Sequence, residues 1–173
     1  AAALRSTWSP CGWSMLSTIT PMSERGRGHR FAGTAAWFVA GATLGGALLG
    51  AVAAGGAALV RAAGGSNDGL TMVFALIVVG ASALDARIAI PALPHLRRQV
   101  DEVWLDEYRP WVYAGGFGAQ IGFGFATYIM SGGVYAVLAG AALSAEPRTA
   151  FVVGLGFGVV RGLAVLAGWR NVD

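Results

Sequence analysis

Long stretches without charge recur along this chain of 173 residues and limit what it can fold into. Residues 31–60 form one such run, which as a helix would be about 45 Å long at about 1.5 Å per residue. Residues 149–168 form another, interrupted by Arg161 alone. About 20 apolar residues suffice to cross the ~30 Å hydrocarbon core of a bilayer. The sequence therefore predicts an all-α integral membrane protein.

The composition supports this interpretation and excludes one class of partner. Hydrophobic residues make up 55% of the chain and charged residues 12%, whereas soluble domains have about a quarter of their residues charged. The 27 glycines in so apolar a chain are typical of tightly packed membrane helices. The net charge of +3 comes from scattered arginines, so nucleic acid is not an expected partner. The expected partners are a lipid bilayer and, as a further possibility, other membrane subunits.

The apolar pattern predicts one transmembrane domain, residues 1–173, with about five crossings. The 30-residue run must tilt, protrude or break, and Gly45-Gly46 is its weakest point. Prolines interrupt the first segment, and the fourth is too long for one straight pass and too short for two, so both are expected to be broken or re-entrant. Trp104 and Tyr108 lie in a predicted surface helix, residues 95–109, on the cytoplasmic side. The expected crossings are residues 4–22, 31–60, 70–90, 111–143 and 149–168.

The arginines predict an orientation. Loops 23–30 and 95–109 and the C-terminal tail together hold seven arginines, and Arg5, Arg61 and Arg148 lie on the other side. Arginine-rich loops stay in the cytoplasm. We therefore expect a multi-pass protein of a bacterial-type plasma membrane, with its N-terminus outside and its C-terminus in the cytoplasm.

Several segments resemble a known family. Trp8-Ser9-Pro10-Cys11-Gly12 opens a short apolar segment, followed by a basic loop and a glycine-rich run at 31–50. This order resembles the cytochrome c biogenesis and thiol-disulfide carrier family, which includes CcdA and the membrane domain of DsbD. Residues 116–122 resemble the family's fourth helix and residues 153–158 its glycine-rich fifth helix.

The resemblance implies an inverted-repeat scaffold. The interrupted segments 8–21 and 113–133 occupy corresponding positions in the two halves, where such scaffolds place a solute site. The family has six helices and a second cysteine in its fourth helix, whereas this chain has five expected crossings and no cysteine after Cys11. A scaffold without the family's disulfide chemistry is therefore expected.

Four residues are candidates for function. Cys11 is a reactive thiol at a helix N-terminus, a metal ligand or a buried group that only fills space. Arg161 and Asp85 lie at similar depth within apolar runs, and either pair with each other or contact a substrate or subunit. The alternative is that Arg161 reaches the headgroups and Asp85 pairs with Arg87. Gln120 either lines a polar cavity or bonds to a neighbouring helix. Gln120, Arg161 and Asp85 are thus the predicted substrate-binding residues.

Other chemistry is not expected from the pattern. His29 and His95 lie in separate loops without ligand-spaced partners, so no metal site is predicted, and no cofactor motif or catalytic triad is present. Three functions remain open. The first is a CcdA-like protein that binds or passes a small solute between two broken helices. The second is a non-catalytic accessory subunit of a larger membrane complex, and the third is a one-cysteine thiol relay to a partner.

Overall fold

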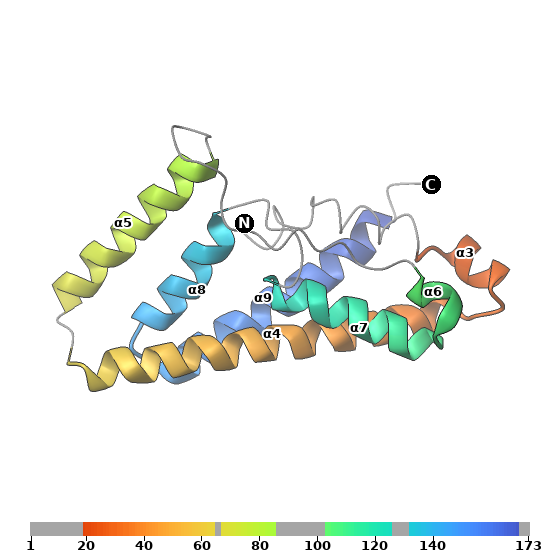
Figure 1. Ribbon diagram of the computed structural model, residues 1–173, viewed down its shortest axis with the longest axis horizontal. Helices are drawn as coiled ribbons and strands as arrows, with labels where there is room; N and C mark the ends of the chain where they lie inside the picture. Colours follow the sequence, from red (N-terminus) through yellow and green to blue (C-terminus); the bar gives the residue numbers. More distant parts are fainter. Residues whose placement is uncertain (1–18, 65–66, 86–102, 126–131, 170–173) are drawn as a thin grey trace.

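The computed structural model describes residues 19–64, 67–85, 103–125 and 132–169, and this part of the chain contains helices and no strand (Figure 1). The predicted all-helical fold is therefore confirmed for the described residues. Cys11, segment 4–18 and residues 86–102, for which the sequence also gave predictions, lie outside this part. The helices are α3 (Pro21–Gly26), α4 (Phe31–Ala62), α5 (Asn67–Asp85), α6 (Trp104–Glu107), α7 (Pro110–Phe123), α8 (Gly133–Leu143) and α9 (Pro147–Trp169).

Helix α4 is the axis of the molecule, and α7, α8 and α9 all pack against it (Figure 1). It runs without interruption for 32 residues, so the break considered at Gly45-Gly46 does not occur. The reason lies in the packing, because Gly45 faces α7 and Gly46 faces α9. The two glycines allow close approach on two sides of one straight helix.

Glycines bring the helix backbones together. A Cβ added at Gly118 or Gly122 of α7 would lie within 3.0 Å of backbone atoms of α4. On the other side, Gly154 and Gly158 of α9 meet Gly50 and Gly46 of α4 in the same way. The tight helix packing expected from the glycine content is thus found along Gly154, Gly158 and Gly162, with α4 as the partner. Where α4 contacts α7, the residue numbers of the contacting pairs increase together, so the two helices are parallel. Where α4 contacts α9, the numbers increase along one helix and decrease along the other, so these two are antiparallel.

The apolar run 111–143 is divided into two helices, as its length required. Helix α7 ends at Phe123 and is followed by Gly124, whose φ of 79° is in the left-handed region that glycine tolerates. Helix α8 starts at Gly133 and packs against α4, α5 and α9. The interruption expected within this run therefore begins at Gly124.

The number of membrane crossings was overestimated. Within the described residues, only α4 is long and apolar enough to cross a bilayer, judged by length and composition. Helices α7 and α8 have 14 and 11 residues, because the break at Gly124 divides one long apolar run into two short ones. Five transmembrane helices are therefore not supported. The surface helix expected at 95–109 is described only from residue 103, where α6 is a single turn.

Candidate functional site

A buried carboxylate joins three helices at the arginine-rich end of the molecule. The side chain of Glu24 in α3 is fully buried. The hydroxyl of Thr34 in α4 donates to Glu24 Oε2 at 2.6 Å, and the Tyr113 hydroxyl in α7 lies 2.9 and 2.8 Å from Oε1 and Oε2. Arg27 Nη1 completes the set at 3.1 Å from Oε1. We call Glu24, Arg27, Thr34 and Tyr113 the Glu24 cluster.

Local sequence explains why α3 presents Glu24 in this position. Thr20 caps the helix, its hydroxyl accepting from the Ser23 backbone while the Ser23 hydroxyl accepts from the Thr20 backbone. Pro21 occupies the first turn, where its missing N–H is not needed. The reciprocal cap fixes a helix of only six residues. Glu24 then follows Ser23 and faces the start of α4.

The Glu24 cluster stabilises a buried carboxylate by hydrogen bonds and an opposite charge. Both Glu24 oxygens accept hydrogen bonds, and Arg27 supplies an opposite charge, so the cost of burying the carboxylate is offset. Burial, followed by the hydrogen bond to Glu24 and the charge of Glu24, raises the pKa of Tyr113 to about 12. The phenol therefore stays protonated and donates at neutral pH. This arrangement ties α3, α4 and α7 together.

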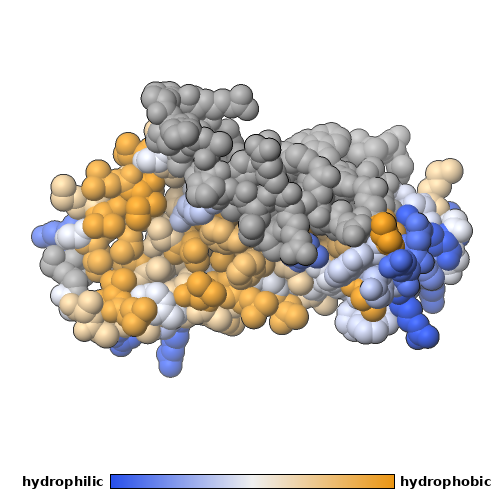
Figure 2. Space-filling model, in the orientation of Figure 1, coloured by the Kyte–Doolittle hydropathy of each residue, from blue (hydrophilic) through white to orange (hydrophobic). Residues whose placement is uncertain are grey.

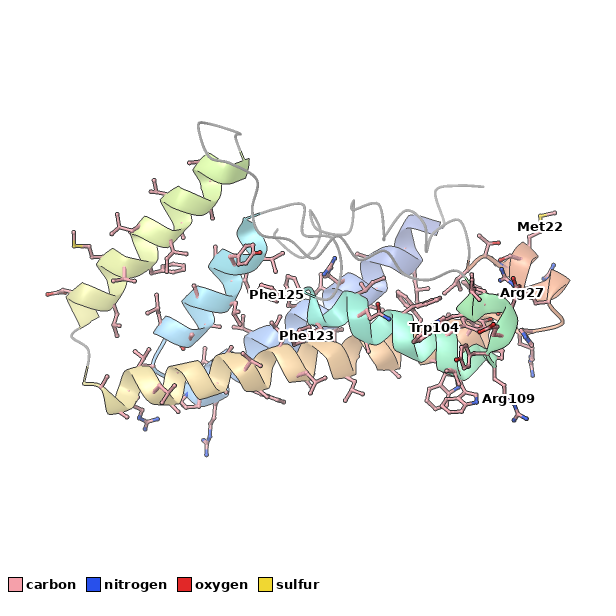
Figure 3. All side chains as sticks on the ribbon, in the orientation of Figure 1. Met22, Arg27, Trp104, Arg109, Phe123 and Phe125 are labelled. Atoms are coloured by element: carbon pink, nitrogen blue, oxygen red, sulfur yellow. The ribbon has the colours of Figure 1, made fainter. Side chains whose placement is uncertain are left out.

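Aromatic side chains surround the same end. Trp104 of α6 stacks on Phe117 of α7 with ring centroids 5.8 Å apart, and the Tyr113 ring centroid lies 6.2 Å from that of Phe117. Leu105, the next residue of α6, is buried in the same hydrophobic core as Tyr113 and Phe117. Figure 3 shows Trp104 and Arg27 together at this end. The short α6 is thus held by its side chains, and it covers the region near the Glu24 cluster.

Arg161 is buried in the interior, with 2% of its surface exposed. Its Nη1 donates to the Ile121 carbonyl at 2.8 Å, and its guanidinium lies 5.6 Å from the Phe157 ring centroid. The Ile121 carbonyl is among the last four of α7, which have no partner within the helix and form its negative end. Arg161 therefore caps α7 from α9, next to the turn at Gly124.

The structure brings together some of the predicted site residues. Gln120 is partly buried on α7, directly before the residue that accepts from Arg161. Asp85 is the last residue of α5, and its side chain lies outside the described part. The pairing of Arg161 with Asp85 and the substrate-binding role of these three residues stay predictions. Cys11 is not among the described residues.

The sequence interpretation missed Glu24, because it treated 23–30 only as a basic loop. Three signals were available. Thr20 and Ser23 flank Pro21 with the spacing of a helix cap. Thr34 and Tyr113 each place a polar group near the start of an apolar run, and buried polar groups require partners. Glu24 is the one carboxylate of its loop and could have been proposed as that partner.

The described residues define a helical protein with glycine-packed helices, one helix long enough to cross a membrane, and a hydrogen-bonded buried carboxylate. Most of the chain is similar to proteins named methylamine utilization protein MauF. It is 35% identical to MauF of Paracoccus versutus over 83% of its own length and 53% of the relative. It is 35% identical to MauF of Paracoccus denitrificans over 76% of the chain and 47% of the relative.

A third relative extends the similarity to almost the entire chain. MauF of Methylorubrum extorquens is 28% identical over 98% of the chain and 60% of the relative. The chain thus spans about half the length of the curated relatives it matches. No family model and no solved structure matches it.

These relatives correct the earlier assignment. The expected membership of the CcdA and DsbD family is wrong, because the relatives are named MauF. The function drawn from that resemblance, passage of a small solute between broken helices, is overturned with it, and neither the accessory subunit nor the thiol relay fits the relatives better. The resemblance depended on three residues at 9–11, too short a motif to identify a family among glycine-rich helices.

Proposed function

We propose that this chain is a membrane-embedded helical protein that functions in methylamine utilization. The observation that carries the proposal is the 35% identity to MauF of Paracoccus versutus across 83% of the chain. Similarity over that length involves most of the chain. The role named for the relatives is therefore extended to this chain as a proposal.

The dimensions of α4 support embedding in a bilayer. Arg30 precedes the helix and Arg61 lies in its last turn. These two arginines are 31 residues apart, about 46 Å along a helix at about 1.5 Å per residue. A bilayer with its headgroups is about 40–45 Å thick. A nearly upright α4 would therefore place one arginine in each headgroup layer.

The outer surface of the bundle is apolar over most of its length. Leu44, Leu48 and Val52 of α4 are each more than half exposed. Helices α5 and α9 add Met72, Leu76 and Val152, which are more exposed still. Figure 2 shows apolar side chains gathered over α4 and α5, and hydrophilic ones at the end formed by α3 and α6. We assign this broad apolar surface to contact with lipid, since soluble monomers rarely expose patches larger than a few hundred Å².

The charges at the two ends support one orientation. Among the described residues, Arg25, Arg27, Arg30 and Arg109 lie at the α3 and α6 end, and Arg61 and Arg148 lie at the other. Arginine is enriched on the cytoplasmic side of membrane proteins. We propose that the α3 and α6 end, with the Glu24 cluster, faces the cytoplasm.

Growth of the source organism tests the proposal. Deletion of the gene is expected to abolish growth on methylamine as the carbon source and to leave growth on succinate unchanged. Expression of the wild-type chain from a plasmid should restore growth on methylamine. Unimpaired growth of the deletion strain on methylamine would contradict the proposed function.

A further inference from the structure

Two tryptophans lie side by side on the outside of the bundle. Trp37 of α4 and Trp111 of α7 have ring centroids 6.2 Å apart with planes inclined at 52°. They are 52% and 53% exposed, although tryptophan is usually well covered in folded proteins. Tyr108, three residues before Trp111, is also exposed. Trp37 and Trp111 thus form an aromatic surface across two helices, and Tyr108 lies just before Trp111 in the chain.

The pair is held rigidly by the backbones beneath it. A Cβ at Gly41 of α4 would collide with the Gly115 backbone of α7, so the two helices are in close contact at this level. Gly115 in turn lies near the Trp37 carbonyl, at 3.9 Å from the position a Cβ would take. The spacing of Trp37 and Trp111 therefore follows from the α4–α7 contact and does not depend on loops.

Two arginines lie next to the aromatic surface, toward the end of the molecule formed by α3 and α6. Arg109 precedes α7 by one residue and lies at the end where α6 and α7 meet (Figure 3). Arg30 directly precedes α4, seven residues before Trp37, and so lies at the same end of the helix as the tryptophan. Both arginines are exposed. Along the chain the order is Arg30, Trp37 and then the exposed aliphatic residues Leu44, Leu48 and Val52.

We propose that Arg30, Trp37, Tyr108, Arg109 and Trp111 form a binding surface for anionic phospholipid headgroups. The guanidinium groups would bind the lipid phosphates, for which arginine has a matching fork of donors. The rings would lie at the level of the headgroups and the upper acyl chains, where tryptophan and tyrosine are enriched in membrane proteins. Continuity with the aliphatic face favours a lipid over free phosphate, because the acyl chains have an apolar surface to follow. This inference rests on the proposed membrane embedding.

Lipid retention by the purified full chain tests the surface. The protein is reconstituted in nanodiscs of equal parts phosphatidylcholine and phosphatidylglycerol, extracted in mild detergent, and its bound lipids are counted by native mass spectrometry. Wild type should retain phosphatidylglycerol in preference to phosphatidylcholine. Arg30→Gln with Arg109→Gln should weaken phosphatidylglycerol binding by about thirtyfold, and the matched pair Arg61→Gln with Arg148→Gln at the other end by much less. Equal effects of the two pairs would overturn the proposed surface.

Tryptophan quenching in the same nanodiscs places the rings by depth. The fluorescence of Trp37 and Trp111 is obtained as the difference between wild type and the double variant Trp37→Phe with Trp111→Phe. Lipids brominated near the headgroup should quench this difference signal more than lipids brominated near the chain ends. The reverse order would contradict the proposed surface while leaving membrane embedding intact. Failure of the protein to enter nanodiscs of either lipid would contradict the embedding itself. Inorganic phosphate binding as tightly as phosphatidylglycerol would also overturn the preference for lipid.

Discussion

Gly122→Ala is expected to lower the free energy of unfolding by about 2–3 kcal/mol, because the new methyl group has no space between two helices. A Cβ at Gly122 would lie 2.7 Å from both the carbonyl carbon and the Cα of Ala42, and closer still to its oxygen. These are backbone atoms of α4, so no side chain can rotate away. Gly158 of α9 approaches the same Ala42 carbonyl from the other side, and α4 therefore cannot shift to make room.

Gly115→Ala is the matched control for this substitution. Gly115 lies on the same helix, and a Cβ there would meet only the Trp37 carbonyl at 3.9 Å, an ordinary contact. Alanine favours helix over glycine by about 1 kcal/mol, so this variant should be as stable as wild type or slightly more stable. Thermal and denaturant unfolding in detergent measures both variants. Equal stability of Gly122→Ala and Gly115→Ala would show that α4 and α7 are not in backbone contact.

Glu24→Ala is expected to cost about 3 kcal/mol of unfolding free energy. The substitution removes the acceptor for Thr34 and Tyr113, and leaves the Tyr113 hydroxyl without its partner inside the protein. Tyr113→Phe should cost about 2 kcal/mol, since the buried carboxylate then loses the hydrogen bond that the phenol donates between its two oxygens. Glu107→Ala and Tyr108→Phe make the same changes at exposed positions and should cost less than about 0.5 kcal/mol each.

The double variant tests whether Glu24 and Tyr113 act as a unit. With both changed, neither partner is left buried and unsatisfied, so the loss should be smaller than the sum of the single losses by about 1–2 kcal/mol. Unfolding of all four proteins under one condition gives this coupling energy. Simple addition of the two single losses would show that the hydrogen bonds between them contribute nothing to stability.

The sequence allowed the helical fold and its close packing to be predicted, because both follow from local composition. Glycines at four-residue spacing, as at Gly154 and Gly158, indicate a helix face that another backbone can approach. The helix that packs against this face could not be predicted from local composition, since Gly46 and Gly50 of α4 lie more than a hundred residues earlier in the chain. The end of α7 was also hidden, because Gly124 follows four other glycines in a run that has no polar stop signal.

The environment of Arg161 was predictable only in part. An arginine inside an apolar run requires a partner, and the sequence offered carboxylates as candidates. The acceptor found in the structure is a backbone carbonyl at Ile121, which becomes available only because α7 ends at Phe123. Glu24 was missed for a related reason. Its donors come from three helices, and nothing in the local sequence around residue 24 points to Tyr113.

The most direct test of the account is whether α4 crosses the membrane, since both the proposed function and the lipid surface depend on it. Gly26 and Ala63 lie beyond its two ends, and both are exposed. Cysteine is introduced at each position in a Cys11→Ser background and labelled in intact cells with a membrane-impermeant thiol reagent. The account predicts labelling of Ala63→Cys in intact cells, and of Gly26→Cys only after the membrane is opened. Labelling of both cysteines, or of neither, in intact cells would contradict it.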